Sequence, residues 1–211
     1  MSGADDNTPP PVATLDGPSG TGKGTVGSLL ARELGWHFLD SGSLYRAVAL
    51  AALQDDLNTG AENGAALGEL ARDLALRFEP QPDGVRIWMR GNEVTDALRS
   101  PEVAEAASQV ASVQEVRDGL LELQRAFRRP PGLVADGRDM GSVVFPQSPA
   151  KFFLTATPEE RARRRYEQLR EQGGDVSLER IKADLKARDQ RDSQRQAAPM
   201  RAPEGACVVD T

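Results

Sequence analysis

The 211-residue sequence contains a single cysteine, Cys207, and a single histidine, His37. One cysteine cannot form a disulfide within the chain and one histidine cannot build a multi-histidine metal site, so we expect a protein of the reducing cytoplasm. The sequence also lacks a run of about 18 apolar residues, which a membrane-spanning helix requires. Its first residues, MSGADDNTPPP, carry acids and prolines where a secretory signal needs basic and then apolar residues. We therefore expect neither export nor membrane insertion.

The sequence also has no net positive charge and few aromatic side chains. The formal net charge is −6, and aromatic residues make up 5% of the chain. Nucleic-acid-binding proteins usually present a basic face, and single-strand binders stack bases on aromatic rings, so we expect no nucleic-acid partner. Arginines nevertheless gather between residues 161 and 195, interleaved with acids. Most of them are expected to form charge pairs on solvated helices, and some could hold small phosphates.

Short apolar runs separated by turn residues predict an α/β fold. Strands are expected at residues 12–16, 36–40, 132–136 and 150–156 and in the terminal sequence ACVVDT. Apolar positions at helical spacing predict a helix at residues 25–34, ended by Gly35, so that the first two strands and this helix form a βαβ unit. The strand runs lack strict alternation, as is typical of strands covered on both faces. A five-stranded parallel sheet flanked by helices is the expected architecture.

The interval between Asp40 and Gly132 is too long for a simple crossover. It contains LRFEPQPDGVRIWMRGNEV, in which the turn residues Pro82, Asp83 and Gly84 separate two apolar segments. This pattern predicts a hairpin inside an insertion.

Two helix starts and one helix break are expected in the second half of the chain. Ser112 and Glu115 form an S-x-x-E capping box, which places Arg117 near the first turn of the following helix. Thr157, with Pro158 and Glu160 after it, marks another start. The pair at residues 173–174, both glycine, divides the arginine-rich region into two helices.

The sequence TLDGPSGTGKGT, residues 14–25, has most features of a phosphate-binding loop. Gly17, Gly22 and Lys23 fit the pattern G-x-x-x-x-G-K, but Gly24 occupies the usual Ser or Thr position and the hydroxyl follows at Thr25. Backbone N–H groups at a helix amino terminus, together with a lysine, can bind an anion without that hydroxyl. Because a strand precedes the loop and an amphipathic helix follows it, we predict that it binds nucleotide phosphates.

Three further groups of polar residues could belong to the same site. They are Ser41, Tyr45 and Arg46 in LDSGSLYR, Asp136, Arg138 and Asp139 in ADGRDMG, and Arg188, Asp192 and Arg195 at positions i, i+4 and i+7 of one helix. The first two groups follow strands, and ligands of parallel sheets bind at the carboxyl ends of the strands. Each group also has an ordinary explanation: a helix cap, a turn pair or an intrahelical ion pair. Their joint presence beside a phosphate loop favours a nucleotide site.

Five stretches together resemble the bacterial cytidylate kinases, nucleoside monophosphate kinases of the phosphate-loop superfamily. They are GPSGTGKGT, LDSGSLYR, ASQVA, ADGRDMGSVVFP and RDQRDSQR, and the similarity runs from about Val12 to the end of the chain. Monophosphate kinases carry Gly and then Thr after the lysine, so the displaced hydroxyl resembles a family trait. The resemblance implies transfer of the ATP γ-phosphoryl group to CMP or dCMP in pyrimidine nucleotide metabolism, with Mg²⁺ accompanying ATP.

The family fold implied by this resemblance is a single P-loop kinase domain at residues 11–211, after a disordered tail at residues 1–10. The core would comprise residues 11–50, 109–157 and 175–211. A monophosphate-binding insertion would lie at about residues 50–108 and a short helical lid at about residues 158–174. We expect a cytoplasmic monomer whose partners are small nucleotides, without a membrane or nucleic-acid partner.

The resemblance also implies a role for each motif residue. The residues implied for the ATP phosphates are Gly17, Pro18, Ser19, Gly20, Thr21, Gly22, Lys23, Gly24 and Thr25, and Thr25 is the candidate Mg²⁺ contact, directly or through water. Those implied for CMP are Ser41, Tyr45, Arg46 and Arg138 at the phosphate, Ser108, Arg117 and Asp139 at the cytosine edge, and Arg188 and Asp192 at the ribose. The implied catalytic residues are Lys23, Arg138, Arg188 and Arg195, and the implied lid arginines are Arg161, Arg164 and Arg165.

Other functions remain open at this point. One is a phosphate-loop kinase with a different acceptor, such as UMP, AMP or a hydroxyl group. A kinase with a hydroxyl acceptor would need an unpaired carboxylate beside the acceptor and fewer arginines facing phosphates. Another is a nucleotide-binding regulatory module, although binding without chemistry does not need so many cations.

Overall fold

The computed structural model describes residues 9–81, 84–171, 176–194 and 200–211. The chain divides into two compact units: the first comprises Met1–Leu39, Gln124–Leu185 and Met200–Thr211, and the second comprises Asp40–Leu123 and Lys186–Pro199. Several predicted features lie outside the described residues: most of the tail, the turn residues Pro82 and Asp83, the glycine pair at 173–174, and Arg195.

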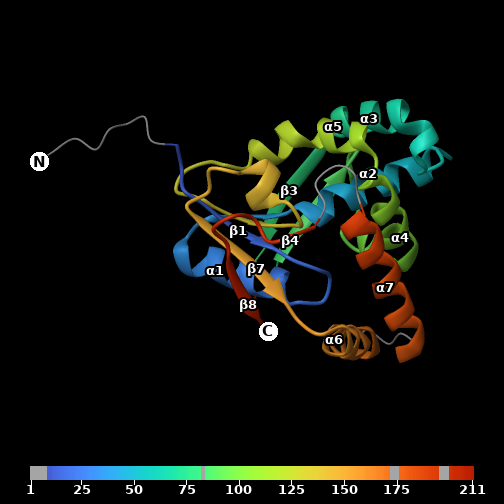
Figure 1. Ribbon diagram of the computed structural model, residues 1–211. Helices are drawn as coiled ribbons and strands as arrows, with labels where there is room; N and C mark the ends of the chain where they lie inside the picture. The colour runs from blue at the N-terminus through green and yellow to red at the C-terminus, as the bar shows by residue number, and fades with distance from the viewer. Residues whose placement is uncertain (1–8, 82–83, 172–175, 195–199) are drawn as a thin grey trace, which may run out of the picture. The chain divides into compact units, whose positions relative to one another are not determined.

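A five-stranded parallel sheet, in the order β2-β6-β1-β7-β8, forms the centre of the first unit (Figure 1). Its strands are β1 (Val12–Asp16), β2 (His37–Asp40), β6 (Leu133–Asp136), β7 (Ala150–Thr155) and β8 (Cys207–Asp210). In β1, Leu15 pairs with Asp136 of β6 on one side and with Phe152 of β7 on the other. The five predicted strands are confirmed, and β6 lies between the two strands of the predicted βαβ unit.

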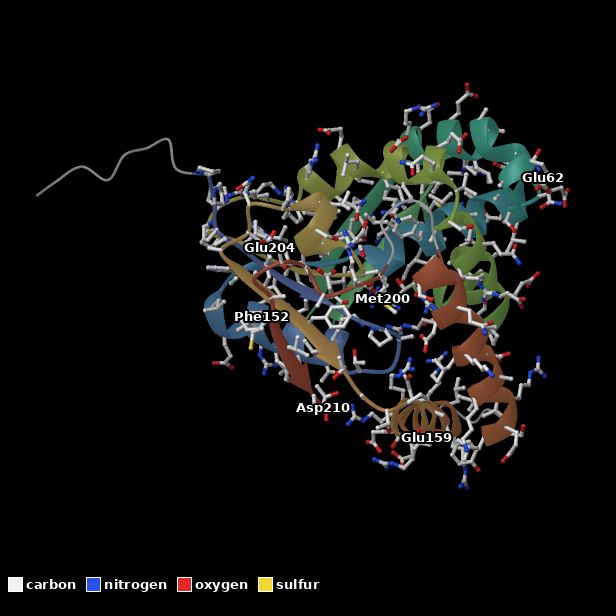
Figure 2. All side chains as sticks on the ribbon, in the orientation of Figure 1. Glu62, Phe152, Glu159, Met200, Glu204 and Asp210 are labelled. Atoms are coloured by element: carbon white, nitrogen blue, oxygen red, sulfur yellow. The ribbon has the colours of Figure 1, made fainter. Side chains whose placement is uncertain are left out.

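The core of this unit explains why the strands are continuously apolar. All five residues of β1 are buried, and Leu15, Val134 and Leu154 form a core cluster with Ala31 of the helix α1 (Lys23–Leu34). Phe152, labelled in Figure 2, packs against this cluster. A sheet covered by side chains in this way needs apolar residues at successive positions. The helix predicted at residues 25–34 is confirmed, although it begins at Lys23.

The arginine-rich region forms two helices, as predicted: α6 (Pro158–Glu171) and α7 (Leu178–Gln194). Thr157 caps α6, because its Oγ1 accepts a hydrogen bond of 3.2 Å from the backbone N–H of Glu160. The Glu160 carboxylate in turn accepts hydrogen bonds of 2.8 Å from Arg163 and from Arg164, which lower its pKa to about 2. The expected charge pairing is therefore present on α6, beginning in the turn that contains Glu159 (Figure 2).

The second unit combines helices with a small antiparallel sheet (Figure 1). Its elements are α2 (Ser41–Gln54), α3 (Gly64–Arg72), α4 (Pro101–Val110), most of α5 (Gln114–Arg125), the strands β3 (Leu76–Gln81), β4 (Gly84–Met89) and β5 (Asn92–Glu93), and two 3₁₀ turns, η1 (Ala61–Asn63) and η2 (Ala97–Arg99). The predicted hairpin is confirmed by the β3–β4 pairing, whereas the short β5 was not predicted. Helix α2 is rich in Ala and Leu and is buried on most sides, where it packs against α3 and α4.

The predicted capping box at Ser112 is wrong. Helix α5 begins at Gln114, so Val113 precedes its first residue. The Ser112 hydroxyl donates instead to the Gln109 carbonyl, at 2.6 Å. Gln109 belongs to the last turn of α4, where carbonyl groups have no partner within the helix, so Ser112 stabilises the end of α4 and not the start of α5.

Candidate functional site

The phosphate loop, residues 17–25, connects β1 to the first turn of α1 in the first unit. Gly17 has a φ of 139°, and a Cβ at this position would lie 2.1 Å from the Leu154 carbonyl oxygen. No other residue fits such a position, since the backbone conformation and the contact both require glycine. Gly22 precedes α1 with a φ of 81° and makes no side-chain cap, so the backbone N–H groups of the first turn border the loop.

Lys23 is buried within this loop, with 5% of its surface exposed. Its Nζ donates hydrogen bonds to the Pro18 carbonyl at 2.7 Å and to Thr21 Oγ1 at 3.4 Å. Thr21 Oγ1 donates to the same Pro18 carbonyl at 3.1 Å. The ammonium group is therefore held across the loop at the amino end of α1, an arrangement that suits a phosphate group.

The three predicted lid arginines have different environments in the first unit. Arg161 is 4% exposed, and its Nη1 donates to the Ser19 carbonyl of the phosphate loop at 3.1 Å. Arg164 bonds to Glu160 and, at 3.1 Å, to Thr211 Oγ1. Arg165 donates to Gln168 at 2.7 Å. Arg161 is thus bonded to the loop, and the lid assignment stays a prediction.

The polar residues after β6 lie beside the same loop. A Cβ on Gly24 would lie 3.6 Å from Asp136 Oδ2, so the Asp136 carboxylate borders the loop. Arg138 is half-buried and donates to the Gly137 carbonyl at 3.1 Å. Asp139 is 4% exposed and precedes the π-helical turn η3 (Met140–Val144). The first unit therefore brings the loop, Asp136 and the Arg138–Asp139 segment together at the carboxyl end of its sheet, where parallel sheets bind ligands.

Asp16 also belongs to this region, although the sequence analysis did not select it. Its side chain is fully buried, and its two carboxylate oxygens accept hydrogen bonds of 2.8 Å from the backbone N–H groups of Met140 and Gly141. Burial, with a smaller contribution from the nearby Asp139, raises the pKa of Asp16 from 3.8 to about 6, although the two hydrogen bonds and Lys23 lower it. The signal that could have identified Asp16 from the sequence is its position as an acid at the end of an apolar run.

The raised pKa fixes the sign of one contribution to stability. The folded protein binds the Asp16 proton more tightly than the unfolded chain does, so the contribution is most favourable at low pH. It is lost as the pH rises from about 4 to about 6, because the carboxylate then ionises in a buried environment. At neutral pH, ionised Asp16 therefore contributes less to the free energy of unfolding than the protonated group does below about pH 4.

In the second unit, three predicted residues lie in the first two turns of α2: Ser41, Tyr45 and Arg46. Asp40 occupies the N-cap position and Ser41 is the first helical residue, so Ser41 does not cap the helix. Arg46 donates through Nη1 to the Leu98 carbonyl at 2.8 Å, which fixes one end of its guanidinium group. Tyr45 is 9% exposed and contributes to the core of this unit.

Three more predicted residues of the second unit are buried polar side chains. Ser108, Arg117 and Asp192 are exposed by 3%, 7% and 1%. Ser108 Oγ accepts a hydrogen bond of 3.0 Å from Arg191 Nε, which joins α4 to the last part of α7. Arg188 is half-buried on the same part of α7. The sequence analysis missed Arg191, although it stands next to Asp192 and three residues from Arg188.

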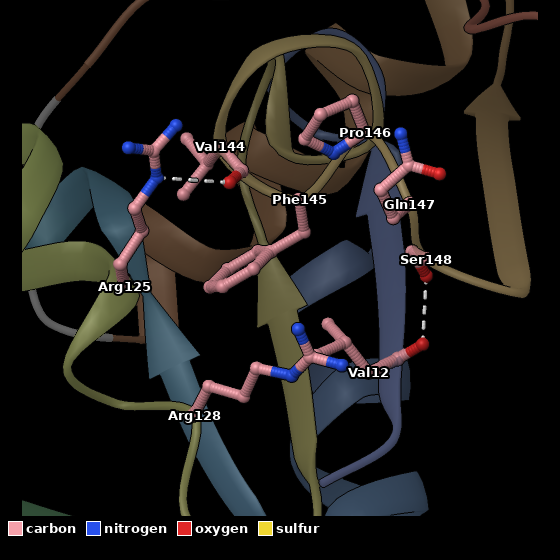
Figure 3. Close-up of a pocket in the computed structure, with 8 residues that line it drawn as sticks. All are labelled: Val12, Arg125, Arg128, Val144, Phe145, Pro146, Gln147 and Ser148. Carbon is pink, nitrogen blue, oxygen red and sulfur yellow. Dashed lines mark hydrogen bonds between the residues drawn. The ribbon is translucent and has the colours of Figure 1, made fainter. Parts of the chain in front are cut away.

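A separate hollow of about 200 Å³ lies at the amino end of β1, where Val12 lines it, whereas the phosphate loop follows the carboxyl end of that strand (Figure 3). Figure 3 shows the Phe145 ring and the side chains of Arg125 and Arg128 around it. Arg125 donates to the Val144 carbonyl at 3.4 Å, and Ser148 donates to the Val12 carbonyl at 2.7 Å. Both bonds run from a side chain to a backbone carbonyl and connect neighbouring segments of the chain. None of the predicted site residues lines the hollow.

The sequence of this chain is similar to those of known kinases. Residues 13–211 match the family model described as cytidylate kinase. A cytidylate kinase of Aeromonas salmonicida is 51% identical over 201 residues, which cover 95% of this chain and 86% of the relative. The cytidylate kinase of Pseudomonas paraeruginosa is 52% identical over 207 residues, covering 97% and 90% of the two chains. That of Shewanella denitrificans is 49% identical over 203 residues, covering 95% and 88%.

Proposed function

We propose that this chain, which belongs to the cytidylate kinase family, transfers the γ-phosphoryl group of ATP to CMP and dCMP. The products would be ADP and CDP or dCDP. The observation that carries this proposal is the phosphate loop with Lys23 held across it, next to the segment that contains half-buried Arg138 and buried Asp139.

Residues of the first unit would bind the donor. The backbone N–H groups at the amino end of α1 and the Lys23 ammonium group would hold the ATP phosphates. Arg161 would stabilise the conformation of the loop, since it is buried and bonded to the Ser19 carbonyl. This arrangement positions the γ-phosphoryl group and offsets its charge, and positioning with charge neutralisation supplies most of the catalysis in phosphoryl transfer.

Mg²⁺ would accompany ATP, and this region offers oxygen ligands of the kind it prefers. Mg²⁺ usually binds through one or two carboxylates together with the substrate phosphates. The Asp136 carboxylate borders the loop at Gly24, and the Thr25 hydroxyl follows in the first turn of α1. These two groups would hold the ion, directly or through water, and the ion would neutralise charge on the phosphates.

Arginines would bind the acceptor phosphate, and no general base is required. The acceptor oxygen belongs to a phosphate that is already ionised near neutral pH, so no proton has to be removed from it. Arg138 and Arg46 would contact this phosphate together with Ser41, and Tyr45 would support them. Arg195 and Arg188 would neutralise charge that develops on the transferring group.

Buried polar side chains would distinguish cytosine from uracil. The Asp139 carboxylate can accept a hydrogen bond from the exocyclic amino group of cytosine, and Arg117 can donate to the ring acceptors of the base. Uracil presents a carbonyl oxygen in place of the amino group, so it would leave Asp139 facing another acceptor. Ser108 would also contact the base, and Arg191 fixes its hydroxyl. Asp192, with Arg188, would hold the ribose.

We expect the acceptor preference of the purified protein to test this function directly. With ATP and Mg²⁺, kcat/KM for CMP and for dCMP should exceed that for UMP or AMP at least tenfold, or about 1.4 kcal/mol in transition-state binding. A coupled assay of ADP release over the four acceptors measures this ratio. Equal rates with all four, or ATP hydrolysis alone, would contradict the proposal. Gel filtration in the same preparation checks the expected monomer.

Two neighbouring substitutions should separate base recognition from phosphate binding. Asp139→Ala removes the acceptor for the cytosine amino group, so we expect the CMP-to-UMP ratio of kcat/KM to fall to within about threefold of unity. Arg138→Ala removes a cation from the phosphate, so we expect kcat/KM to fall about 10²-fold with both acceptors.

Arg163→Ala is the matched control for this pair. Its guanidinium is exposed on α6 and pairs with Glu160 and Glu167, so neither parameter should change. A loss of discrimination in Arg138→Ala, with discrimination intact in Asp139→Ala, would reverse the two assignments.

A further inference from the structure

The segment that contains Arg138 and Asp139 is attached to β1 on both sides. Before it, the backbone N–H of Gly137 donates to the Leu15 carbonyl at 3.0 Å. After it, the N–H groups of Met140 and Gly141 donate to the Asp16 carboxylate at 2.8 Å each. Two consecutive residues of β1 therefore hold the beginning and the end of this segment, and the next residue along the chain is Gly17 of the phosphate loop.

The second attachment depends on a single side chain. Leu15 contributes a backbone carbonyl, which any residue would provide, whereas only a carboxylate can accept two N–H donors with two oxygens at this position. The bonds are charge-assisted, which makes them stronger than bonds between neutral groups. They also meet the first two N–H groups of the π-helical turn η3, and Asp139 immediately precedes this turn. Local π-helical geometry frequently marks functional sites.

Burial of this carboxylate has a cost as well as a benefit. Asp16 is fully buried and lies near Asp139, so its pKa is raised to about 6 and its ionisation is less favourable in the folded protein than in the unfolded chain. Carboxylates with pKa values perturbed in this way gather at functional sites.

We propose that Asp16 is a positioning residue for the acceptor nucleotide. It holds the Arg138–Asp139 segment at a fixed place relative to the phosphate loop, so that the acceptor is aligned with the bound donor. This inference rests on the proposed roles of Arg138 and Asp139 in binding CMP. Because misplacement of a binding group by about 1 Å can cost on the order of 10²-fold in rate, a lost attachment should be visible in acceptor kinetics.

Two variants break the attachment in different ways. Asp16→Asn keeps the shape of the side chain but leaves one oxygen, so an amide NH₂ group faces one of the two backbone N–H donors. Gly141→Ala keeps the carboxylate, but its Cβ would lie 2.7 Å from Thr14 Oγ1 and 3.3 Å from Asp16 Oδ2, so the turn must move away from β1.

Thr14→Val is the matched control, because it changes a buried side chain of the same strand at the same turn. Thr14 Oγ1 is buried and has no hydrogen-bond partner among the residues that the structure describes, so its loss leaves both Asp16 bonds in place. The measurements are KM for CMP, the CMP-to-UMP ratio of kcat/KM, the dissociation constant for ATP by calorimetry, and the thermal midpoint.

We expect Asp16→Asn and Gly141→Ala to raise KM for CMP about tenfold and to lower the CMP-to-UMP ratio at least about threefold. Their ATP dissociation constants should stay within about twofold of the wild-type value, as should every parameter of Thr14→Val. If Asp16→Asn does not fold, Gly141→Ala alone decides the result.

Unchanged acceptor parameters in the folded variants would overturn the inference. Equal losses of ATP and CMP binding would overturn it too, because they would indicate damage to the phosphate loop as a whole. Wild-type protein without a preference for CMP would instead refute the proposed function, and this inference with it. A wild-type preference that survives both substitutions refutes only the role of Asp16.

Discussion

Replacing Lys23 by alanine should lower kcat for phosphoryl transfer to CMP by about 10³-fold while the protein stays folded. The ammonium group is buried at the amino end of α1 and already bonded across the phosphate loop, so in the proposed function it would bind the donor phosphates from a fixed position. Alanine leaves the helix terminus but removes the full positive charge, which contributes most when negative charge moves between the two nucleotides. Steady-state and single-turnover kinetics with ATP and CMP measure the loss, and circular dichroism confirms the fold.

Lys182→Ala provides the control, because this lysine is exposed on α7. Its kcat should equal that of the wild type. If Lys23→Ala retained more than about a tenth of the wild-type kcat, the loop would bind ATP mainly through its backbone and the lysine would have no special part in the reaction.

Gly17→Ala should lower the free energy of unfolding by more than about 4 kcal/mol, or prevent folding. The new Cβ would lie 2.1 Å from the Leu154 carbonyl oxygen, inside the sheet, at a φ of 139° that side chains rarely adopt. Neither β1 nor β7 can retreat without losing the pairing of Asp16 with Phe153. Urea denaturation followed by tryptophan fluorescence measures the change, and soluble yield gives a first indication.

Gly35→Ala separates steric overlap from backbone strain. Gly35 ends α1 with a φ of 65°, but apart from its chain neighbours a Cβ there would meet no atom of the described residues within 4 Å. We expect this variant to lose only about 1 kcal/mol, the cost of a left-handed conformation. Equal losses in the two variants would show that conformation, and not the contact with Leu154, makes Gly17 necessary.

Local signals in the sequence predicted most of the fold. The strands follow from apolar runs such as Val12–Asp16, and Gly17 and Gly22 were identifiable because a phosphate loop needs their backbone conformations at fixed spacing. The start of α6 was readable because Thr157 bonds to a residue three positions away. Ser112 misled for the opposite reason: a hydroxyl between two helices can bond to either one, and the sequence does not say which.

Distant contacts could not be predicted in the same way. Asp16 bonds to Met140 and Gly141, and Arg191 bonds to Ser108. In each case the partner lies far along the chain, and no periodicity or motif records the pair. The sequence therefore indicated which residue types the site needs. It did not indicate which other buried side chains fix the positions of the site residues through hydrogen bonds.

The pairing of β1 has a consequence for the order of folding. Val12 pairs with Leu133 and Ala13 pairs with Ala150, so both neighbours of β1 are made long after it during synthesis. Contacts between distant parts of a chain form slowly, since the intervening segment must first be brought together. We expect the phosphate loop, although it stands near the beginning of the chain, to acquire its structure late. A nascent chain that stops before β6 would carry the complete loop sequence without the strand and the turn that hold the loop in place.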